Sequence, residues 1–222
     1  MIAENIQTIN STIPNTVKLI AVSKTKPFTD IQVAYDAGQR DFGENKVQEL
    51  VNKTLVLPKD IRWHLIGHLQ TNKVKYIAPF VHLIHAVDSI KLLKEINKQA
   101  KKYGRNINCL LQFHIAQEST KFGLSLVEAQ EIVVSTEFLQ LENVTICGVM
   151  GMASFVSDQA VITTEFKKLK EIFSELKSTA FSENGNFTEI SMGMSGDYDA
   201  AIQAGSTMIR VGSKIFGHRN TN

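Results

Sequence analysis

The sequence has little of several features that mark specialised classes of protein. Only two cysteines occur among 222 residues, too few for a disulfide framework. No apolar run is long enough to cross a membrane, and the N-terminal residues lack the basic segment and apolar core of a secretory signal. Basic residues exceed acidic residues by only 24 to 22, so no basic surplus points to nucleic acid. We therefore expect a cytoplasmic protein that binds neither membranes nor nucleic acid.

Segments that would separate domains are also lacking. The four prolines and 13 glycines form no linker and no low-complexity tract. Hydrophobic residues make up 43% and charged residues 21% of the chain, as in ordinary globular proteins. A chain of this length can bury a sizeable core in one domain, and single α/β barrels fall in this size range. We expect residues 1–222 to form one domain and the protein to be a monomer, with Cys109 and Cys147 as reduced thiols inside strands.

Short apolar runs alternate with amphipathic segments along the chain. We predict strands at residues 17–24, 41–45, 62–66, 81–87, 107–113, 144–150, 188–191 and 207–211, with helices between them. The spacing of Ile2, Ile6, Ile9 and Ile13 predicts a further helix before the first strand. Alternation of this kind favours a (β/α)8 TIM barrel, with a doubly wound sheet as the alternative. Little chain follows the last strand, so the N-terminal helix is expected to fill the place of the eighth helix.

Lys24 is the first candidate functional residue. It follows a buried apolar run at residues 19–22, and Pro27 prevents the strand from continuing. An amine at the carboxyl end of a core strand is well placed to be desolvated, to lose its proton and to attack a carbonyl group. The alternative is a lysine whose charged end simply reaches solvent at the rim of the fold.

In a barrel, ligand-binding residues gather at the carboxyl ends of the strands. The predicted ends carry Lys24, Glu44, Asn45, Gly67, His68, His85, His114 and residues 150–152, 191–195 and 210–213. The last two segments are rich in small residues, which let backbone N–H groups approach an anion. Barrels often bind phosphate at the loops after strands seven and eight, although any strand must end in a polar turn. The two loops together therefore indicate a phosphate site.

Arg210 lies inside an apolar strand, where a buried charge needs a partner. The partner is either a carboxylate across the barrel or a ring nitrogen or anionic group of a ligand. A metal site is not predicted, because His64 and His68 are separated by a break in the strand and His82 and His85 have no clear third ligand. No nucleophile-elbow motif supports a Ser-His-Asp triad.

Four motifs follow one another in an order that resembles one known family. They are AVSKTKP at 21–27, DFGEN at 41–45, WHLIGHLQTNK at 63–73 and SMGMSGDYDAAIQAGSTMIRVGSKIFG at 191–217. Over essentially its whole length, the chain resembles the pyridoxal phosphate homeostasis proteins. That family is similar to the barrel domain of alanine racemase, so the resemblance implies an alanine-racemase-like TIM barrel with an additional N-terminal helix.

The resemblance also implies a site for pyridoxal 5'-phosphate. Lys24 matches the lysine that forms a Schiff base with the cofactor, and Arg210 matches the arginine that faces its pyridine nitrogen. Residues of the two last loops match the phosphate-binding loops. The implied cofactor-binding residues are Lys24, Asn45, Ser195, Arg210, Gly212 and Ser213, with no catalytic residue and no metal. Two segments depart from the family pattern, Lys46 after the GEN turn and residues 114–117, and the second leaves a role for Lys121 open. A secondary cofactor role for Lys26 is open as well.

The function implied by the resemblance is storage, buffering or delivery of pyridoxal phosphate, with apo-enzymes as acceptors and without a robust catalytic cycle. Catalysis is not expected because Arg210 would leave the pyridine nitrogen unprotonated and because none of the four tyrosines is an obvious second base. The chain also ends at Asn222 with no residues for the second domain of alanine racemase. The alternatives are an amino-acid racemase using the same cofactor and a cofactor-free barrel enzyme that acts on a phosphorylated metabolite.

Overall fold

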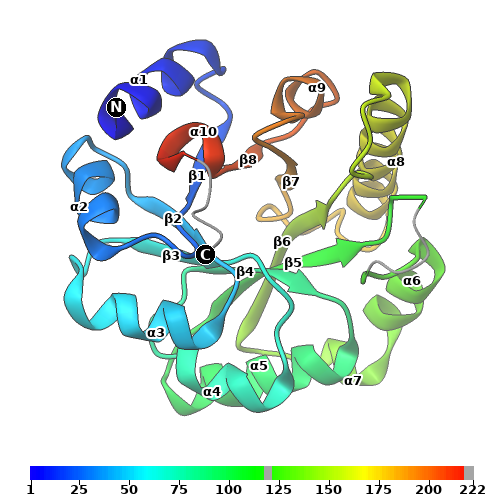
Figure 1. Cartoon of the computed structure of the whole chain (residues 1–222). Coiled ribbons are helices and arrows are strands. Elements are labelled where there is room, and N and C mark those ends of the chain that lie inside the picture. The colour runs from blue at the N-terminus through cyan, green and yellow to red at the C-terminus, as the bar shows by residue number, and fades with distance from the viewer. Residues whose placement is uncertain (118–121, 218–222) are drawn as a thin grey trace.

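The computed structural model describes residues 1–117 and 122–217, and within them eight parallel strands form a closed barrel (Figure 1). Each strand pairs with its neighbours in chain order, and β1 closes the barrel against β8. The strands are β1 (Lys18–Val22), β2 (Asp41–Glu44), β3 (Arg62–Leu65), β4 (Leu83–Val87), β5 (Ile107–Phe113), β6 (Val144–Gly151), β7 (Glu189–Met194) and β8 (Met208–Val211). The predicted TIM barrel is confirmed.

Helices surround the barrel and connect successive strands (Figure 1). They are α1 (Ile2–Thr12), α2 (Phe28–Asp36), α3 (Val47–Val56), the 3-10 turn η1 (Thr71–Lys73), α4 (Val74–Ile77), α5 (Ile90–Lys102), α6 (Leu126–Val134), α7 (Thr136–Leu139), α8 (Gln159–Ser178), α9 (Tyr198–Gln203) and α10 (Ser213–Phe216). None of the helices in the described part of the chain is long and apolar enough to cross a membrane.

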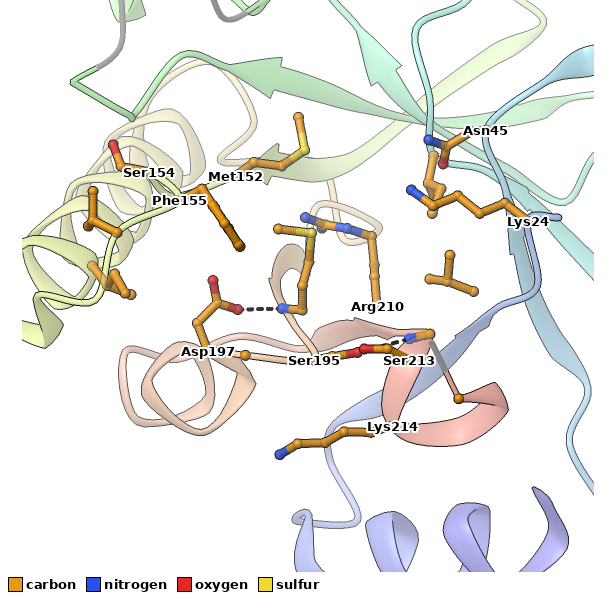
Figure 2. A pocket seen from close by; sticks show the side chains of 18 of the residues that line it. Lys24, Asn45, Met152, Ser154, Phe155, Ser195, Asp197, Arg210, Ser213 and Lys214 are labelled. Carbon is orange, nitrogen blue, oxygen red and sulfur yellow. Dashed lines mark hydrogen bonds between the residues drawn. The ribbon is translucent and has the colours of Figure 1, made fainter. Parts of the chain in front are cut away.

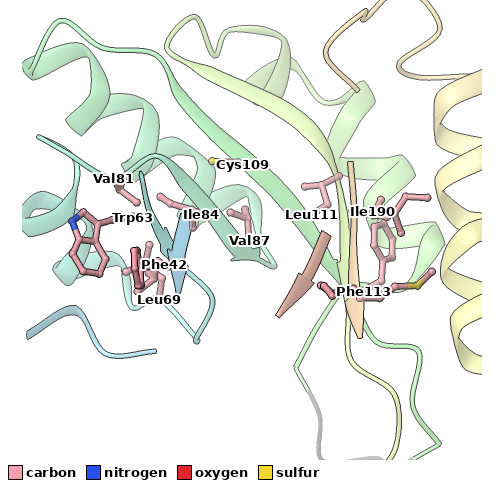
Figure 3. Packing of buried hydrophobic residues seen from close by; sticks show 14 of the residues in the cluster. Phe42, Trp63, Leu69, Val81, Ile84, Val87, Cys109, Leu111, Phe113 and Ile190 are labelled. Atoms are coloured by element: carbon pink, nitrogen blue, oxygen red, sulfur yellow. The ribbon is translucent and has the colours of Figure 1, made fainter. Parts of the chain in front are cut away.

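The main hydrophobic core lies between the outer face of the barrel and these helices. Alternate residues of each strand point outward, since successive side chains of a strand lie on opposite faces. Phe42, Trp63, Ile84 and Val87 belong to this layer and are at most 3% exposed (Figure 3). The rings of Phe42 and Trp63 lie 5.9 Å apart, an ordinary spacing for packed aromatic pairs. This apolar layer joins neighbouring units of the barrel and fixes which residues face inward.

Helix α1 packs beside both α2 and α10 (Figure 1). Its apolar face buries Ile6 and Ile9, as the spacing of the isoleucines predicted. The side-chain amide of Asn5 donates a hydrogen bond of 2.9 Å to the carbonyl of Ile215 in α10. Because α10 has only four residues, α1 adds helical cover beside it at the end of the barrel chain.

Two placements of residues at strand ends were wrong in ways that matter for the site. Strand β7 runs to Met194 and not to Ser191, so Ser191 is a buried strand residue and not part of a loop. His85 lies in the middle of β4, fully buried, and not at its carboxyl end. In both places the polar residue belongs to the strand and lies in the barrel interior. On the sequence alone, a polar residue after an apolar run is typical of a strand that is ending.

Candidate functional site

A cavity of about 870 Å³ opens at the carboxyl ends of the strands, and the six residues implied to bind the cofactor all line it (Figure 2). They come from the turns after β1, β2, β7 and β8 and from β8 itself. Lys24 and Arg210 both extend into the cavity (Figure 2). The predicted set is Lys24, Asn45, Ser195, Arg210, Gly212 and Ser213, and the structure brings its six members together. The fold therefore gathers an amine, a guanidinium and two hydroxyls around one space.

The turn that carries Lys24 is held on both sides of that residue. Strand β1 ends at Val22, and Lys24 is half-buried in the turn that follows. Thr25 has a φ of +65°, in the left-handed region that residues other than glycine seldom adopt. Its backbone N–H donates to Glu49 Oε1 over 2.6 Å. Ser23, on the other side, donates its hydroxyl to Glu44 Oε1 over 2.5 Å.

A buried ion-pair network behind this turn supplies those contacts. Lys53 of α3 is 2% exposed, and its Nζ lies 2.7 Å from Glu44 Oε1 and 2.6 Å from Glu49 Oε1. The same Nζ donates to the backbone carbonyl of Ser23 over 2.8 Å. Burial raises the pKa of Glu44 to about 6, although the ammonium of Lys53 opposes the shift. The network anchors the residues on either side of Lys24 to α3.

Sequence reasoning missed Lys53, and one signal would have found it. Lys53 shares a buried helical face with Val47 and Leu50, at spacings of three residues. A lysine on the apolar face of a helix needs acidic partners, and the partly buried Glu49 four residues earlier is one of them.

Asn45 is positioned by close contact between two backbones. It follows β2, and Gly67, which follows β3, lies against it. A Cβ atom at Gly67 would lie only 2.5 Å from the carbonyl oxygen of Asn45. The glycine in the WHLIGHLQTNK motif thus allows the two turns to approach each other at the mouth of the cavity.

The turns after β7 and β8 are joined directly. The backbone N–H of Gly212 donates to Ser195 Oγ over 3.2 Å (Figure 2). A Cβ atom at Gly212 would lie 3.2 Å from the carbonyl of Val22, so this turn also presses against β1. The described residues that line the cavity include four basic side chains, Lys24, Lys26, Arg210 and Lys214, and one acidic side chain, Asp197. The surplus of positive charge suits an anionic group such as a phosphate.

Arg210 is 4% exposed and forms hydrogen bonds to neutral oxygens. Nη1 donates to Ser191 Oγ over 2.6 Å, and Nη2 donates to the carbonyl of Gly151 over 3.0 Å. Across the residues that the structure describes, no carboxylate forms an ion pair with it, so the first of the two predicted partners is not found. Burial lowers the pKa of Arg210 to about 10, which leaves the group a cation at neutral pH. The charge of Asp197 acts on Arg210, but a buried cation that forms no ion pair with a described carboxylate is suited to a polar ligand in the cavity.

Three further candidates, Lys26, Lys121 and His68, are not assigned to the cofactor-binding set. Lys26 lines the cavity, but its Nζ donates to the carbonyls of Phe216 and Gly217 and so ties the first turn to the end of α10. Lys121 lies outside the described residues. His68 is not among the residues that line the cavity and stacks on Phe122.

One side-chain group in the described ranges has the composition of a metal site. Asp41, His64 and His82 place their ligand atoms within 4.8 Å of one another, so His82 does have acidic and imidazole neighbours that the sequence did not reveal. Both carboxylate oxygens of Asp41 already accept hydrogen bonds from Arg62, over 2.8 and 2.5 Å. A carboxylate in a bidentate pair with arginine is a poor metal ligand.

The sequence matches the family described as "Alanine racemase, N-terminal domain" over residues 1–220. It is 39% identical to the pyridoxal phosphate homeostasis protein of Vibrio alginolyticus, over 93% of this chain and 88% of that protein. It is also 37% identical to the protein of that name from Synechocystis sp., over 95% of both chains.

Solved structures agree with these relationships. PipY from Synechococcus elongatus PCC7942 superposes with a TM-score of 0.91 without pyridoxal phosphate and 0.89 with it bound, at 36% identity over 98% of this chain and 100% of that one. Alanine racemase from Clostridium difficile 630 gives a TM-score of 0.77 at 15% identity and shares the fold alone, over 60% of its own length. The chain therefore belongs to the family of pyridoxal phosphate homeostasis proteins, which is built on the alanine racemase N-terminal domain.

Proposed function

We propose that this protein binds pyridoxal 5'-phosphate in the cavity at the carboxyl ends of the strands and holds it for storage, buffering or delivery. The observation that carries the proposal is the meeting of Lys24, Arg210, Ser195 and Ser213 around one space. When bound, pyridoxal phosphate supplies an aldehyde, a phosphate and an electron-accepting ring. The relatives named for its homeostasis, and the PipY structure with it bound, support the same ligand.

The side chains around the cavity match the aldehyde, the phosphate and the ring nitrogen of this ligand in turn. The primary amine of Lys24 can condense with the aldehyde carbon, forming a C=N link and releasing one water molecule. The hydroxyls of Ser195 and Ser213 can donate to the phosphate, within a rim that carries more positive than negative side chains. Arg210 has donors and no acceptor, so a ring nitrogen placed against it would accept a hydrogen bond and remain unprotonated.

The same geometry supports binding without a robust catalytic cycle. An unprotonated ring withdraws electrons less strongly, so proton removal from a bound amino acid gains less help. No tyrosine is among the described residues that line the cavity. Tyr198, the tyrosine nearest in sequence to the cavity residues Ser195 and Asp197, could be considered as a second base. It is 7% exposed, and the centre of its ring lies 4.4 Å from Lys214 Nζ. We therefore propose a carrier and not an amino-acid racemase.

Hydrogen exchange separates these two functions. The loaded protein is incubated with L- and D-alanine in deuterated water, and deuterium at the α-carbon is measured. A carrier gives exchange far below an ordinary enzymatic turnover of roughly 1 per second. Sustained exchange or racemisation at that rate, abolished by Lys24→Ala, would establish the racemase instead.

We further propose that the protein acts in the cytoplasm, as a monomer, and passes the cofactor to apo-enzymes. Cys109 and Cys147 are both buried free thiols, which is compatible with a reducing compartment. Delivery is tested by mixing the loaded protein with an apo-enzyme that requires pyridoxal phosphate, in the presence of a phosphatase that destroys the free cofactor. Recovery of enzyme activity despite the phosphatase supports direct transfer, and complete loss of recovery refutes it.

A further inference from the structure

A file of buried polar side chains crosses the barrel interior and ends on Arg210. At its far end, Asp41 Oδ1 lies 3.0 Å from His64 Nε2. His64 Nδ1 then lies 2.9 Å from His85 Nε2, and His85 Nδ1 lies 2.9 Å from Ser191 Oγ. Ser191 Oγ accepts the 2.6 Å hydrogen bond from Arg210. We call Asp41, His64, His85 and Ser191 the buried file; none of the four is more than 6% exposed.

The chemistry of the two ends fixes the direction of every hydrogen bond in the file. Arg210 can only donate, so the oxygen of Ser191 accepts from it. The carboxylate of Asp41 can only accept, so two neutral rings must each donate toward Asp41, and Ser191 then gives its own proton to His85 Nδ1. His85 must then carry its proton on Nε2 and donate to His64 Nδ1. His64 likewise carries its proton on Nε2 and donates to the carboxylate of Asp41. Each ring is satisfied as a neutral imidazole, with one donor and one acceptor.

The charges around the file agree with this arrangement. Burial lowers the pKa of His64 and lowers that of His85 well below its ordinary value, so both rings remain neutral. Burial alone would raise the pKa of Asp41, but hydrogen bonds from Arg62 and His64 outweigh it and hold the group ionised. The other charged or titratable groups that act on the two rings are Lys18 of β1, Arg62 of β3, His82 before β4 and Arg210 of β8. The surroundings are mostly basic, which further disfavours a charged imidazole.

We propose that Ser191 and His85 are positioning residues for Arg210, and that the buried file sets the orientation of the guanidinium toward the ring nitrogen of the bound cofactor. The inference rests on the proposed function, because that ring nitrogen belongs to pyridoxal phosphate. Besides the bond to Ser191, Arg210 is held by one hydrogen bond to a backbone carbonyl. Loss of the serine contact therefore releases one of two anchors of a side chain that has no described anionic partner.

Substitutions that remove a hydrogen bond of the buried file should change how Arg210 binds the cofactor in the cavity. Ser191→Ala leaves an N–H of Arg210 and Nδ1 of His85 without partners, and the guanidinium is then free to turn. His85→Leu removes the group that receives the serine proton. We expect either change to weaken pyridoxal phosphate binding about tenfold, the loss expected for one hydrogen bond to a charged group. The absorbance band of the bound cofactor should also shift, because the hydrogen bond to its ring nitrogen changes.

Two further variants separate positioning from general loosening of the barrel. His85→Asn places an amide group where Nδ1 lies, and so can still accept from Ser191; it should restore most of the affinity and the wild-type band. Leu110→Ala opens a cavity in the apolar cluster that shares the barrel interior, formed by Leu83, Ala86, Leu110, Cys147, Met150 and Met208. It should lower stability but leave the band unshifted.

Nuclear magnetic resonance of the protein without cofactor measures directly which nitrogen of His64 and of His85 carries the proton. Histidine labelled with nitrogen-15 should show His64 and His85 as neutral rings protonated at Nε2 at pH 7. A ring protonated at Nδ1, or a charged ring, would overturn the assigned direction of the file.

The binding results distinguish this inference from the proposed function. If wild type binds pyridoxal phosphate and Ser191→Ala and His85→Leu bind it equally well with an unshifted band, the positioning role is wrong and the function stands. If Leu110→Ala shifts the band as much as His85→Leu, the effect is general loosening and the role is again wrong. If wild type forms no reducible link with pyridoxal phosphate, both proposals are wrong.

Discussion

Mild acid should destabilise this protein, because its barrel interior holds two neutral histidines. The pKa of His64 and of His85 is lowered by burial in the folded protein, whereas an unfolded chain has a histidine pKa of about 6.5. Below that value the unfolded state binds protons that the folded state does not. The free energy of unfolding must therefore fall as the pH falls from 7 toward 5.

The size of the effect follows from the linkage relation. A histidine that stays fully neutral in the folded protein costs at most about 2 kcal/mol of stability between pH 7 and pH 5, so the pair costs up to about 4 kcal/mol. Glu44 acts in the opposite direction, because its pKa of about 6 lies above its ordinary value and its protonation favours the folded state. It restores about 1 kcal/mol over the same interval, which leaves a net loss of up to about 3 kcal/mol from these three groups. The lowered pKa of His82, which is partly exposed, acts in the same direction as the pair.

Urea denaturation at pH 7, 6 and 5 measures this loss. In His85→Leu one titrating group is removed, so the drop between pH 7 and pH 5 should shrink, by up to about 2 kcal/mol, even though the variant is less stable at every pH. Leu110→Ala, which creates a cavity without removing a titrating group, should keep the wild-type drop. A flat profile in wild type, or an equal drop in His85→Leu and wild type, would refute the placement of neutral histidines in the core.

Three further predictions concern the cavity and its support. Changing Ser195 and Ser213 together to alanine should weaken pyridoxal phosphate binding about tenfold or more, and equal wild-type affinity for pyridoxal and its phosphate would rule out a phosphate site there. Lys53→Met should lower stability by about 3–5 kcal/mol in urea denaturation, because the buried carboxylate of Glu44 and the partly buried carboxylate of Glu49 lose their cation; a loss below 1 kcal/mol would show that the network is weak. Gly67→Ala should cost about 1–3 kcal/mol and weaken cofactor binding, since its Cβ would meet the backbone of Asn45, and unchanged stability would contradict that close contact.

The strand ends could be predicted from the sequence because the signals there are local. Lys24 follows an apolar run and precedes a proline, and Gly212 and Ser213 follow a strand that contains a charge. Closing a barrel in chain order brings all such ends to one rim, so residues far apart in sequence meet around one cavity.

The buried file could not be predicted, because it depends on which inward-facing residues meet across the barrel. His64, His85 and Ser191 lie on β3, β4 and β7, and no spacing along the chain links them. Polar residues in a strand are usually a sign that the strand is ending, which is why His85 and Ser191 were placed at strand ends. In this barrel each polar group is satisfied by the next, so the strands continue through them.

The most direct test of the account is to find where pyridoxal phosphate attaches. Wild-type protein is loaded with the cofactor, reduced with borohydride, digested and mapped by mass spectrometry, with Lys24→Ala and Lys26→Ala treated in parallel. We expect that the reduced cofactor lies on Lys24, that Lys24→Ala loses the absorbance band of the C=N link, and that Lys26→Ala keeps it. Attachment mainly at Lys26 or Lys121, or an unchanged band in Lys24→Ala, would contradict it.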